Sequence, residues 1–512
     1  MSIPPTSHLE LDERSRDVYE DVPAYPKALP VPLPDLSDPQ SFRSFVGKIT
    51  PFSLFIGRSI LRLIGLKRDY PEFVKNIESA MRRANTRLPG LYAPVISASL
   101  ALEDDPRTAD PLWRAASLIA GARSLCTDLF SGKLPPDTLK NQPLEMGQYP
   151  NLFATSLVIE NGQARMYKSK HFEKINLVLG GRYFQLDLGS LETGASIEPI
   201  HQALQRLVET FGPDAIPREE NSPGYLTASA DRTQFQAFTQ IAALPQNRSS
   251  LQAIRHSLLT VCLDLDHSPK SAAEATRLAQ AGNIGNRWYH SSLQVVIFGN
   301  GKACLICNFT CYLDGNVMMR GGAEIQKRAA GWPLPTEADP KTVLADPLQL
   351  EWDIAPDLLK LANKDIQAVL DDQPATYTIK GFGRKFFDAR NLHAVPVFIV
   401  ALEMAVHRLT GAMPTIAQFL TMSRYRCTDM TIQKVTTPEV VTCVEKLDFA
   451  DPDNTQIIPL LQQAIASQNE AARQARSQLT LTDLATTYML NLPKARRRRA
   501  MLFYFLGMVT LK

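Results

Sequence analysis

The sequence predicts a layered α/β or α+β fold, because helical and strand-like stretches follow one another irregularly along the chain. Apolar residues recur at helical spacing over Pro111–Ser131, Ala394–Leu409 and Gln456–Ser477. Short alternating or β-branched runs predict strands. These runs are Asn176–Leu179, Tyr183–Leu188, Leu293–Phe298 and Ala303–Asn308. Asn300-Gly301 separates the last two runs, which predicts a hairpin with a primed turn.

The N-terminal part of the chain has a different character. Residues 1–40 are rich in proline and polar residues, and Leu29–Pro34 predicts an extended polyproline segment. We expect residues 1–24 to be a flexible arm. Helical periodicity returns over Ser41–Arg87, and the run Lys133–Asp137 ends the helix that begins at Pro111.

Composition excludes several classes of protein. The chain has 512 residues, with 55 Lys and Arg against 52 Asp and Glu, so the net charge is only +3. That balance argues against a nucleic-acid partner. The hydrophobic fraction of 45% excludes disorder over the whole chain.

The sequence also predicts where the protein works. No apolar run approaches the roughly 20 residues that span a bilayer, and the longest, Ala500–Leu511, is too short. The charged run Glu10–Arg16 close to the start is unlike a signal or transit peptide. Seven cysteines, an odd number, indicate reduced thiols. We therefore expect a cytoplasmic protein without a transmembrane segment, and we expect a monomer.

Many short segments, in a fixed order, resemble the choline/carnitine acyltransferase family. The segments are Leu29–Leu33, Arg114–Ala122, Leu134–Asp137, Met146–Phe153, Tyr225–Thr227, Val261–Asp264, Asn286–Tyr289, Leu293-Gln294, Phe382–Arg384 and Thr428-Asp429. The resemblance implies two similar α/β domains, each like a chloramphenicol acetyltransferase subunit, with a tunnel between them. It predicts residues 100–345 as one domain, with an altered catalytic loop at 300–315. Residues 25–99 plus 346–512 would form the second domain, shortened at its C-terminus, with an exposed sheet edge that Ala500–Leu511 covers.

The family's catalytic histidine is missing. The resemblance implies that this histidine takes the proton of the acceptor hydroxyl, as imidazole suits this role at neutral pH. Counting from Gly301 places Phe309 at its position, and counting back from Asp314 places Thr310 there. Neither side chain accepts a proton at neutral pH. Asp314 remains as a candidate orienting group and Phe309 as a candidate substrate contact.

Two residues near this position are candidate replacements. Cys311, or Cys307 before it, is either a nucleophile or an inert core residue. His290 stands where the family usually has Asp, and is either a base or a structural histidine. We expect no metal, because Cys304 faces the other side of the strand from Cys307 and Cys311, which disfavours a site of three thiolates.

The resemblance also indicates a site for the phosphates of CoA. Arg384 keeps the charge of the family's first Lys, whereas Asp388 reverses that of the second. Lys385 and Arg390 are candidates to restore positive charge, and a solvated basic face is the alternative. An acyl-CoA or a carrier-bound acyl thioester is the candidate co-substrate.

The acceptor site has lost its polar groups. Thr415–Ala417 replaces the family's Thr-Tyr-Glu, and Cys427 replaces Arg, so that only Thr428 and Asp429 remain as substrate contacts. We expect no activity on carnitine or choline and a more apolar ligand.

The sequence leaves three functions open. The first is a specialised-metabolism acyltransferase that processes an apolar acyl chain by a non-histidine mechanism. The others are a tunnel that catalyses cyclisation and a catalytically inactive, binding member.

Overall fold

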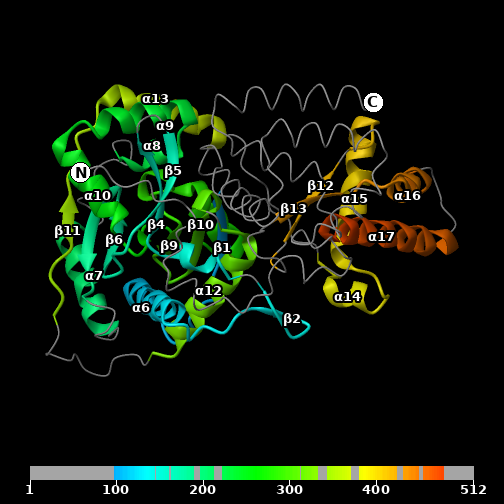
Figure 1. Cartoon of the computed structure of the whole chain (residues 1–512), viewed down its shortest axis with the longest axis horizontal. Coiled ribbons are helices and arrows are strands. Elements are labelled where there is room, and N and C mark those ends of the chain that lie inside the picture. The colour runs from blue at the N-terminus through cyan, green and yellow to red at the C-terminus, as the bar shows by residue number, and fades with distance from the viewer. Residues whose placement is uncertain are drawn as a thin grey trace, which may run out of the picture. The chain divides into compact units, whose positions relative to one another are not determined.

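The computed structural model describes most of the chain from residue 97 onward, in two compact units (Figure 1). The described ranges are 97–144, 146–160, 163–189, 197–212, 222–311, 313–332, 343–370, 380–414, 416–421, 423, 430–448 and 454–477. The described part of unit 1 lies within Asn85–Asp137 and Met146–Pro374, and that of unit 2 within Thr138–Glu145 and Ala375–Lys512. The predicted arm at 1–24, the polyproline segment, the helical stretch 41–87 and the tail 500–511 lie outside these ranges.

A mixed seven-stranded sheet forms the centre of unit 1. Its strand order is β1-β10-β9-β8-β6-β7-β11. The strands are β1 (Ser97–Ala101), β6 (Lys174–Leu179), β7 (Arg182–Asp187), β8 (Thr260–Asp264), β9 (Leu293–Phe298), β10 (Ala303–Asn308) and β11 (Leu348–Leu350). Strand β8 runs parallel to β6 and β9, and the other neighbours are antiparallel. The prediction of a mixed α/β fold is confirmed.

Helices cover both faces of this sheet. Along β8 and β9, Val261, Leu263 and Val295 belong to one buried cluster, whereas Cys262 and Val296 belong to a second. Alternate residues of a strand point to opposite faces, so the sheet separates two cores. The first core contains residues of α6 (Pro111–Phe130), α7 (Ile197–Phe211) and α12 (Gly315–Ala330). The second contains residues of α8 (Gly224–Ala228), α9 (Asp231–Ile241), α10 (Pro245–Arg255), α11 (Ala272–Arg277) and α13 (Pro356–Leu370).

The sequence of helix α6 contains small residues because the helix packs closely against α12. Asp110 caps its start, because the carboxylate accepts hydrogen bonds from the backbone N–H groups of Leu112 and Trp113. A Cβ atom at Gly121 would lie 2.5 Å from the carbonyl oxygen of Ile325 in α12. The two helices therefore approach closely only because position 121 carries no side chain.

The β9–β10 hairpin corrects one prediction. Ala303 pairs with Ile297, and the Phe298 N–H donates to the Lys302 carbonyl at 2.9 Å. The loop therefore has three residues, and of Asn300 and Gly301 only Gly301 has a positive φ, +78°. A primed two-residue turn needs positive φ at its central residues, so that prediction was wrong. Gly301, the third residue of the loop, adopts the left-handed conformation instead.

Smaller elements complete unit 1. Strands β4 (Thr155–Glu160) and β5 (Gln163–Lys168) form an antiparallel hairpin. Short helical turns are η1 (Tyr149–Leu152), η5 (Leu278–Gly282), η6 (Ile284–Asn286) and η7 (Phe309–Cys311). The turn η7 directly follows β10, at the position of the altered loop.

Unit 2 is mainly helical in its described part. It contains α14 (Arg384–Asp388), α15 (Ala394–Thr410), α16 (Pro438–Asp448) and α17 (Asn454–Ser477), together with β2 (Thr138–Leu139), β3 (Gln142–Pro143), β12 (Ala417–Thr421) and β13 (Met430–Lys434). Val400 of α15 packs with Val440, Val444 and Ala464. The helices predicted at 394–409 and 456–477 are confirmed as α15 and α17. Strands β12 and β13 pair only with each other among the described residues, and the predicted second domain stays a prediction.

No helix in the described ranges is long and apolar enough to cross a membrane.

Candidate functional site

The turn η7 places the altered loop at the C-terminal end of β10. The regular strand ends at Asn308, and Phe309, Thr310 and Cys311 form a turn of 3₁₀-helix. Phe309 is half-buried and packs against the first core. Its ring accepts no proton, so it contributes shape to the end of β10 and no acid–base group.

Thr310 is tied to the strand that precedes it. Its backbone N–H and its hydroxyl both donate to Oδ1 of Asn308, at 2.9 and 2.5 Å. The amide of Asn308 in turn donates to the Tyr289 carbonyl at 2.8 Å. The Thr310 side chain is buried. Its hydroxyl proton is therefore already engaged, which leaves the hydroxyl weakly suited to a chemical role.

Cys311 is a buried thiol rather than an activated one. Its Sγ donates to the carbonyl oxygen of His290 at 3.8 Å. Burial raises the pKa of this thiol far above its usual range, and burial likewise raises the pKa of Cys307 to about 12. The thiolate is the nucleophilic form, so neither cysteine is poised for covalent catalysis near neutral pH.

Asp314 caps the helix that follows the turn. Its Oδ1 accepts hydrogen bonds from the backbone N–H groups of Asn316 and Val317, at 3.0 and 3.1 Å. Its own N–H donates to Oε1 of Gln148 at 2.8 Å. Burial raises the pKa of the carboxyl group. The N-cap signal lay in Asp314-Gly315-Asn316 ahead of a helical run, and sequence reasoning assigned only an orienting role to this residue.

His290 is buried in unit 1, on the side of the sheet that carries the second core. Its Nε2 lies 2.9 Å from Oε1 of Gln234, and its ring centroid lies 4.8 Å from that of Phe238. Burial, with a smaller contribution from Arg255, lowers the pKa of His290 to about 3. The imidazole is neutral at physiological pH and is a weak base, which favours the structural interpretation over the catalytic one.

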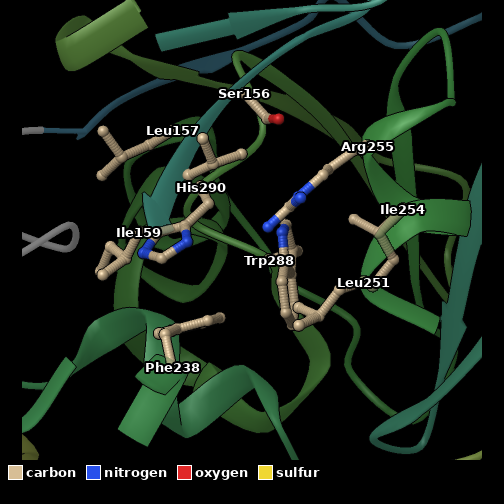
Figure 2. A pocket seen from close by; sticks show the side chains of 10 residues that line it. Ser156, Leu157, Ile159, Phe238, Leu251, Ile254, Arg255, Trp288 and His290 are labelled. Carbon is tan, nitrogen blue, oxygen red and sulfur yellow. The ribbon is translucent and has the colours of Figure 1, made fainter. Parts of the chain in front are cut away.

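A small pocket adjoins His290 (Figure 2). Its polar lining comprises Ser156, Arg255 and His290, and Arg255 pairs with Glu160 at 2.6 Å. The apolar lining comprises Leu157, Val158, Ile159, Phe238, Leu251, Ile254 and Trp288. The cavity volume is about 10 Å³, which is room for about one water molecule. This pocket is therefore too small, as described, to hold an acyl chain.

A buried ion pair joins Asp264 and Arg287. It was not predicted from the sequence. Asp264, at the end of β8, accepts two hydrogen bonds from Arg287, at 2.9 and 2.6 Å, and one from Asn286 at 2.7 Å. Burial opposes the charge of Arg287, but the Asp264 carboxylate outweighs this effect and raises the pKa of Arg287. The signal was present as an Asp that ends an apolar strand and an Asn-Arg pair further on. These contacts fix the segment 286–290 that leads into β9.

A second polar cluster joins two other motifs to α12. The Tyr149 hydroxyl donates to the Asp137 carboxylate, and Arg320 of α12 pairs with the same carboxylate at 2.9 Å. Arg320 also donates to the Pro135 carbonyl at 2.6 Å. The segments 134–137 and 146–153 thus meet at one face of α12, next to the cap formed by Asp314.

The candidate CoA cations lie in unit 2. Arg384, Lys385 and Arg390 are exposed on and just after α14. Arg384 lies 3.6 Å from the carboxylate of Asp388, so the residue that reverses the family's charge also partly neutralises the retained cation. Arg390 stacks on the ring of Phe386, 3.8 Å from its centroid. Among the described residues, Lys385 makes no ion pair or ring contact of this kind.

The predicted acceptor contacts belong to a part of the chain outside the described ranges. Thr428 and Asp429 lie outside the described ranges, as do Thr415 and Cys427. The described ranges hold no cluster of three or more His, Cys, Asp or Glu residues able to bind a metal ion. Cys304 belongs to the second core, whereas Cys307 and Cys311 belong to the first.

Comparison with known proteins identifies one family. A model of the choline/carnitine O-acyltransferase family matches residues 87–478. Choline O-acetyltransferase of Sus scrofa is 26% identical over 388 residues, which covers 71% of this chain and 60% of that protein. Human choline O-acetyltransferase is 25% identical over 398 residues (71% and 51%), and Columba livia carnitine O-acetyltransferase is 22% identical over 390 residues (70% and 59%). The match thus spans 60% or less of the length of these relatives.

Proposed function

This chain belongs to the choline/carnitine O-acyltransferase family, and from that premise we propose that it handles an acyl group without an imidazole base. The substrate is an apolar acyl chain, presented as a thioester on CoA or on a carrier protein, in specialised metabolism. The chain is transferred or otherwise processed by a non-histidine mechanism. The observation that carries this proposal is the turn η7, where Phe309 and the hydrogen-bonded Thr310 stand at the end of β10.

Catalysis without a base draws on positioning and on stabilisation of developing charge. A thioester is an activated acyl donor, and correct placement of an acceptor contributes a large part of many rate enhancements. The candidate contacts with the reacting group are Phe309 and Thr310, which directly follow β10, and Asp314, which caps α12. Cys311 and His290 remain weaker candidates, because burial holds the pKa of the thiol high and that of the imidazole low.

The same proposal includes a tunnel between two similar domains. Thr428 and Asp429 would contact the acceptor, and Arg384, Lys385 and Arg390 would face the phosphates of CoA. The loss of the polar acceptor groups supports an acceptor more apolar than carnitine or choline. A cyclisation of the bound chain needs only the same shape and positioning, and it is an alternative within this proposal.

A second candidate function is binding without chemistry. It is favoured by the observation that each candidate reactive group is already committed: Thr310 to Asn308, Asp314 to the start of α12, and His290 to Gln234. In that case the protein holds a thioester or a partner and releases it unchanged.

One experiment separates these functions. The full chain is incubated with acyl-CoA thioesters of graded length, from acetyl to palmitoyl, and three quantities are measured: release of free CoA, binding by calorimetry, and the intact protein mass. Release of CoA above the buffer rate supports chemistry, and saturable binding without release supports the second candidate. A mass increase equal to one acyl group would instead identify a covalent nucleophile.

A matched pair of variants assigns the activity to the site. Phe309→Ala enlarges the end of β10 and should change the preferred chain length, whereas Phe419→Ala on the exposed strand β12 should leave it unchanged. If no thioester is bound or cleaved, and none acylates the protein, the proposed function is wrong. A polyketide or peptide synthase gene beside this one would support the assignment to specialised metabolism.

A further inference from the structure

Two histidines from distant parts of the sequence stack on each other in unit 1. His171 lies in the loop between β5 and β6, and His256 caps the C-terminal end of α10. Their ring centroids are 4.6 Å apart, and the ring planes are inclined by 39°. The side chain of His171 is 52% exposed, so water reaches the pair. The stack therefore joins the loop to the end of α10 through two side chains that can each gain a positive charge.

Each ring has a hydrogen-bonding partner that tolerates its protonation. Nε2 of His256 lies 3.0 Å from the hydroxyl of Tyr167 on β5, and a phenol oxygen can accept as well as donate. Nδ1 of His171 lies 3.0 Å from Oε1 of Glu173, whose negative charge favours a protonated ring. A charge on one ring is thus accommodated, and a conflict arises only when both rings are charged.

The surroundings of His256 oppose a positive charge there. Arg255 precedes it in the chain, paired with Glu160 of β4 at 2.6 Å, and Lys174 begins β6. Burial, the neighbouring histidine, Arg255 and Lys174 lower the pKa of His256 from its ordinary value of 6.5. Glu173 acts in the opposite direction but does not offset them. The last turn of a helix attracts cations, yet these groups outweigh that attraction. The stack is therefore stable with neutral rings and repulsive with two charged rings.

We propose that His171 and His256 form a pH-sensitive latch. At neutral pH the uncharged rings hold the loop between β5 and β6 against the end of α10. In mildly acidic solution both rings gain a proton, repel each other and release the loop. Histidine side chains change charge between about pH 5 and pH 8, so the latch responds within a range that cells use. It does not depend on the chemistry proposed above.

The backbone limits the movement to the middle of the loop. The N–H groups of Ser169 and Leu188 donate to the carbonyls of Ala154 and Glu173, each at 2.7 Å, and so hold both ends. Residues 170–172 can therefore move outward while β5 and β6 stay in place. The ring of Phe172 lies 4.9 Å from that of Phe130, and this contact opposes a wider opening.

Nuclear magnetic resonance tests the coupling of the two rings in the full chain. Histidine labelled with ¹³C at Cε1 is titrated from pH 8 to pH 4.5, and the midpoint of His256 is measured. His171→Gln should raise this midpoint by about 0.5 pH unit or more, because it removes a charge 4.6 Å away. His267→Gln, which follows the other end of β8, is the matched control and should leave the midpoint unchanged. An unchanged midpoint in His171→Gln would overturn the latch.

Hydrogen–deuterium exchange tests the release of the loop. The amides of His171 and Phe172 are followed at pH 7.5 and pH 5, with correction for the intrinsic rate at each pH. In the wild type their exchange should be at least about tenfold faster at pH 5. In His256→Gln, which keeps a partner for Tyr167 but carries no charge, the two rates should agree within about twofold. Strand β9 is the internal reference. Equal acceleration in β9 would indicate general unfolding and overturn the proposal, as would a wild-type loop that does not respond to pH.

Discussion

The hydroxyl of Thr310 donates to the side-chain carbonyl of Asn308, 2.5 Å away, and the backbone N–H of Thr310 donates to the same oxygen. The side chain that organises the turn at the end of β10 is therefore an amide and not an imidazole. A carbonyl oxygen does not become a base at neutral pH, and the hydroxyl that it holds is not activated. The predictions below follow from this arrangement and from the groups packed around it.

The protein should not transfer acetyl groups to carnitine or choline. The imidazole that would take the proton of these acceptors is absent from the end of β10, and Thr415–Ala417 and Cys427 replace the polar groups that would hold them. We expect the rate of CoA release from acetyl-CoA to be the same with and without either acceptor. Turnover of about 1 per second or faster with carnitine or choline would contradict this prediction.

Restoring a histidine should not restore that activity. Phe309→His and Thr310→His each place an imidazole in η7, but a base must also lie about 3 Å from the acceptor and be held in orientation. Asp314, the nearest candidate for that task, is engaged by the N–H groups of Asn316 and Val317. Groups that act as a unit are lost as a unit. Carnitine-dependent CoA release by either single variant would show that the site is far less altered than this geometry indicates.

Breaking the Asp264–Arg287 pair should destabilise the protein strongly. Asp264→Asn leaves a buried guanidinium without its counter-charge, which typically costs about 3–5 kcal/mol of unfolding free energy. Chemical denaturation monitored by tryptophan fluorescence measures the loss. Asp388→Asn, which removes an exposed partner of Arg384, is the matched control and should change stability by less than about 1 kcal/mol. Similar losses of unfolding free energy in the two variants would mean that the buried pair stabilises the protein no more than the exposed pair does.

His290 should make stability depend on pH. Burial lowers its pKa from 6.5 to about 3. Between these values the unfolded chain binds a proton that the folded chain does not, so stability falls as the pH falls from about 6.5 toward 3. The slope from this one group is about 1.4 kcal/mol per pH unit at most.

The variant His290→Gln isolates this contribution, because it keeps a hydrogen-bonding partner for Gln234 and removes the titration. The wild-type minus variant difference in unfolding free energy should shrink on acidification below pH 6.5. A difference that is constant from pH 7 to pH 4 would show that His290 has the same pKa in the folded and the unfolded protein.

The thiols of Cys307 and Cys311 should be unreactive until the protein unfolds. Burial raises the pKa of both, so the reactive thiolate is scarce and shielded. Treatment of the native protein with iodoacetamide, followed by peptide mapping, should leave both unmodified, and treatment in denaturant should modify both. Rapid, selective labelling of native Cys311 would revive its interpretation as a nucleophile.

Short-range patterns predicted several elements of the fold closely, and left others, such as α7 and α12, unpredicted. Leu293–Phe298 and Ala303–Asn308 coincide with β9 and β10, and the helix from Pro111 ends one residue before its predicted end. The turn between the strands was mistaken because Asn300-Gly301 fits a two-residue loop as well as the last two positions of a three-residue loop. Only the register of the strand pairing separates these two cases.

The sequence predicted which groups the candidate site lacks. It did not predict the contacts of the groups that remain. The loss of histidine could be counted from Gly301 and Asp314. The partners of the remaining groups could not be predicted, because His290 meets Gln234 and Asp314 meets Gln148 across long stretches of sequence. Only the folded chain shows that Thr310, Asp314 and His290 are already hydrogen-bonded, which is the observation that favours the second candidate function.

Gly121 offers a way to ask what a cell loses without this protein. Because α6 and α12 touch at that point, one added methyl group must push the two helices apart, and α12 begins at Gly315, directly after its cap Asp314 and close to the altered turn. Gly121→Ala is thus suited to serve as a temperature-sensitive allele, tolerated when the culture is cool and inactivating when it is warmed. A shift in growth temperature would then lower the amount of folded protein and reveal which metabolite accumulates.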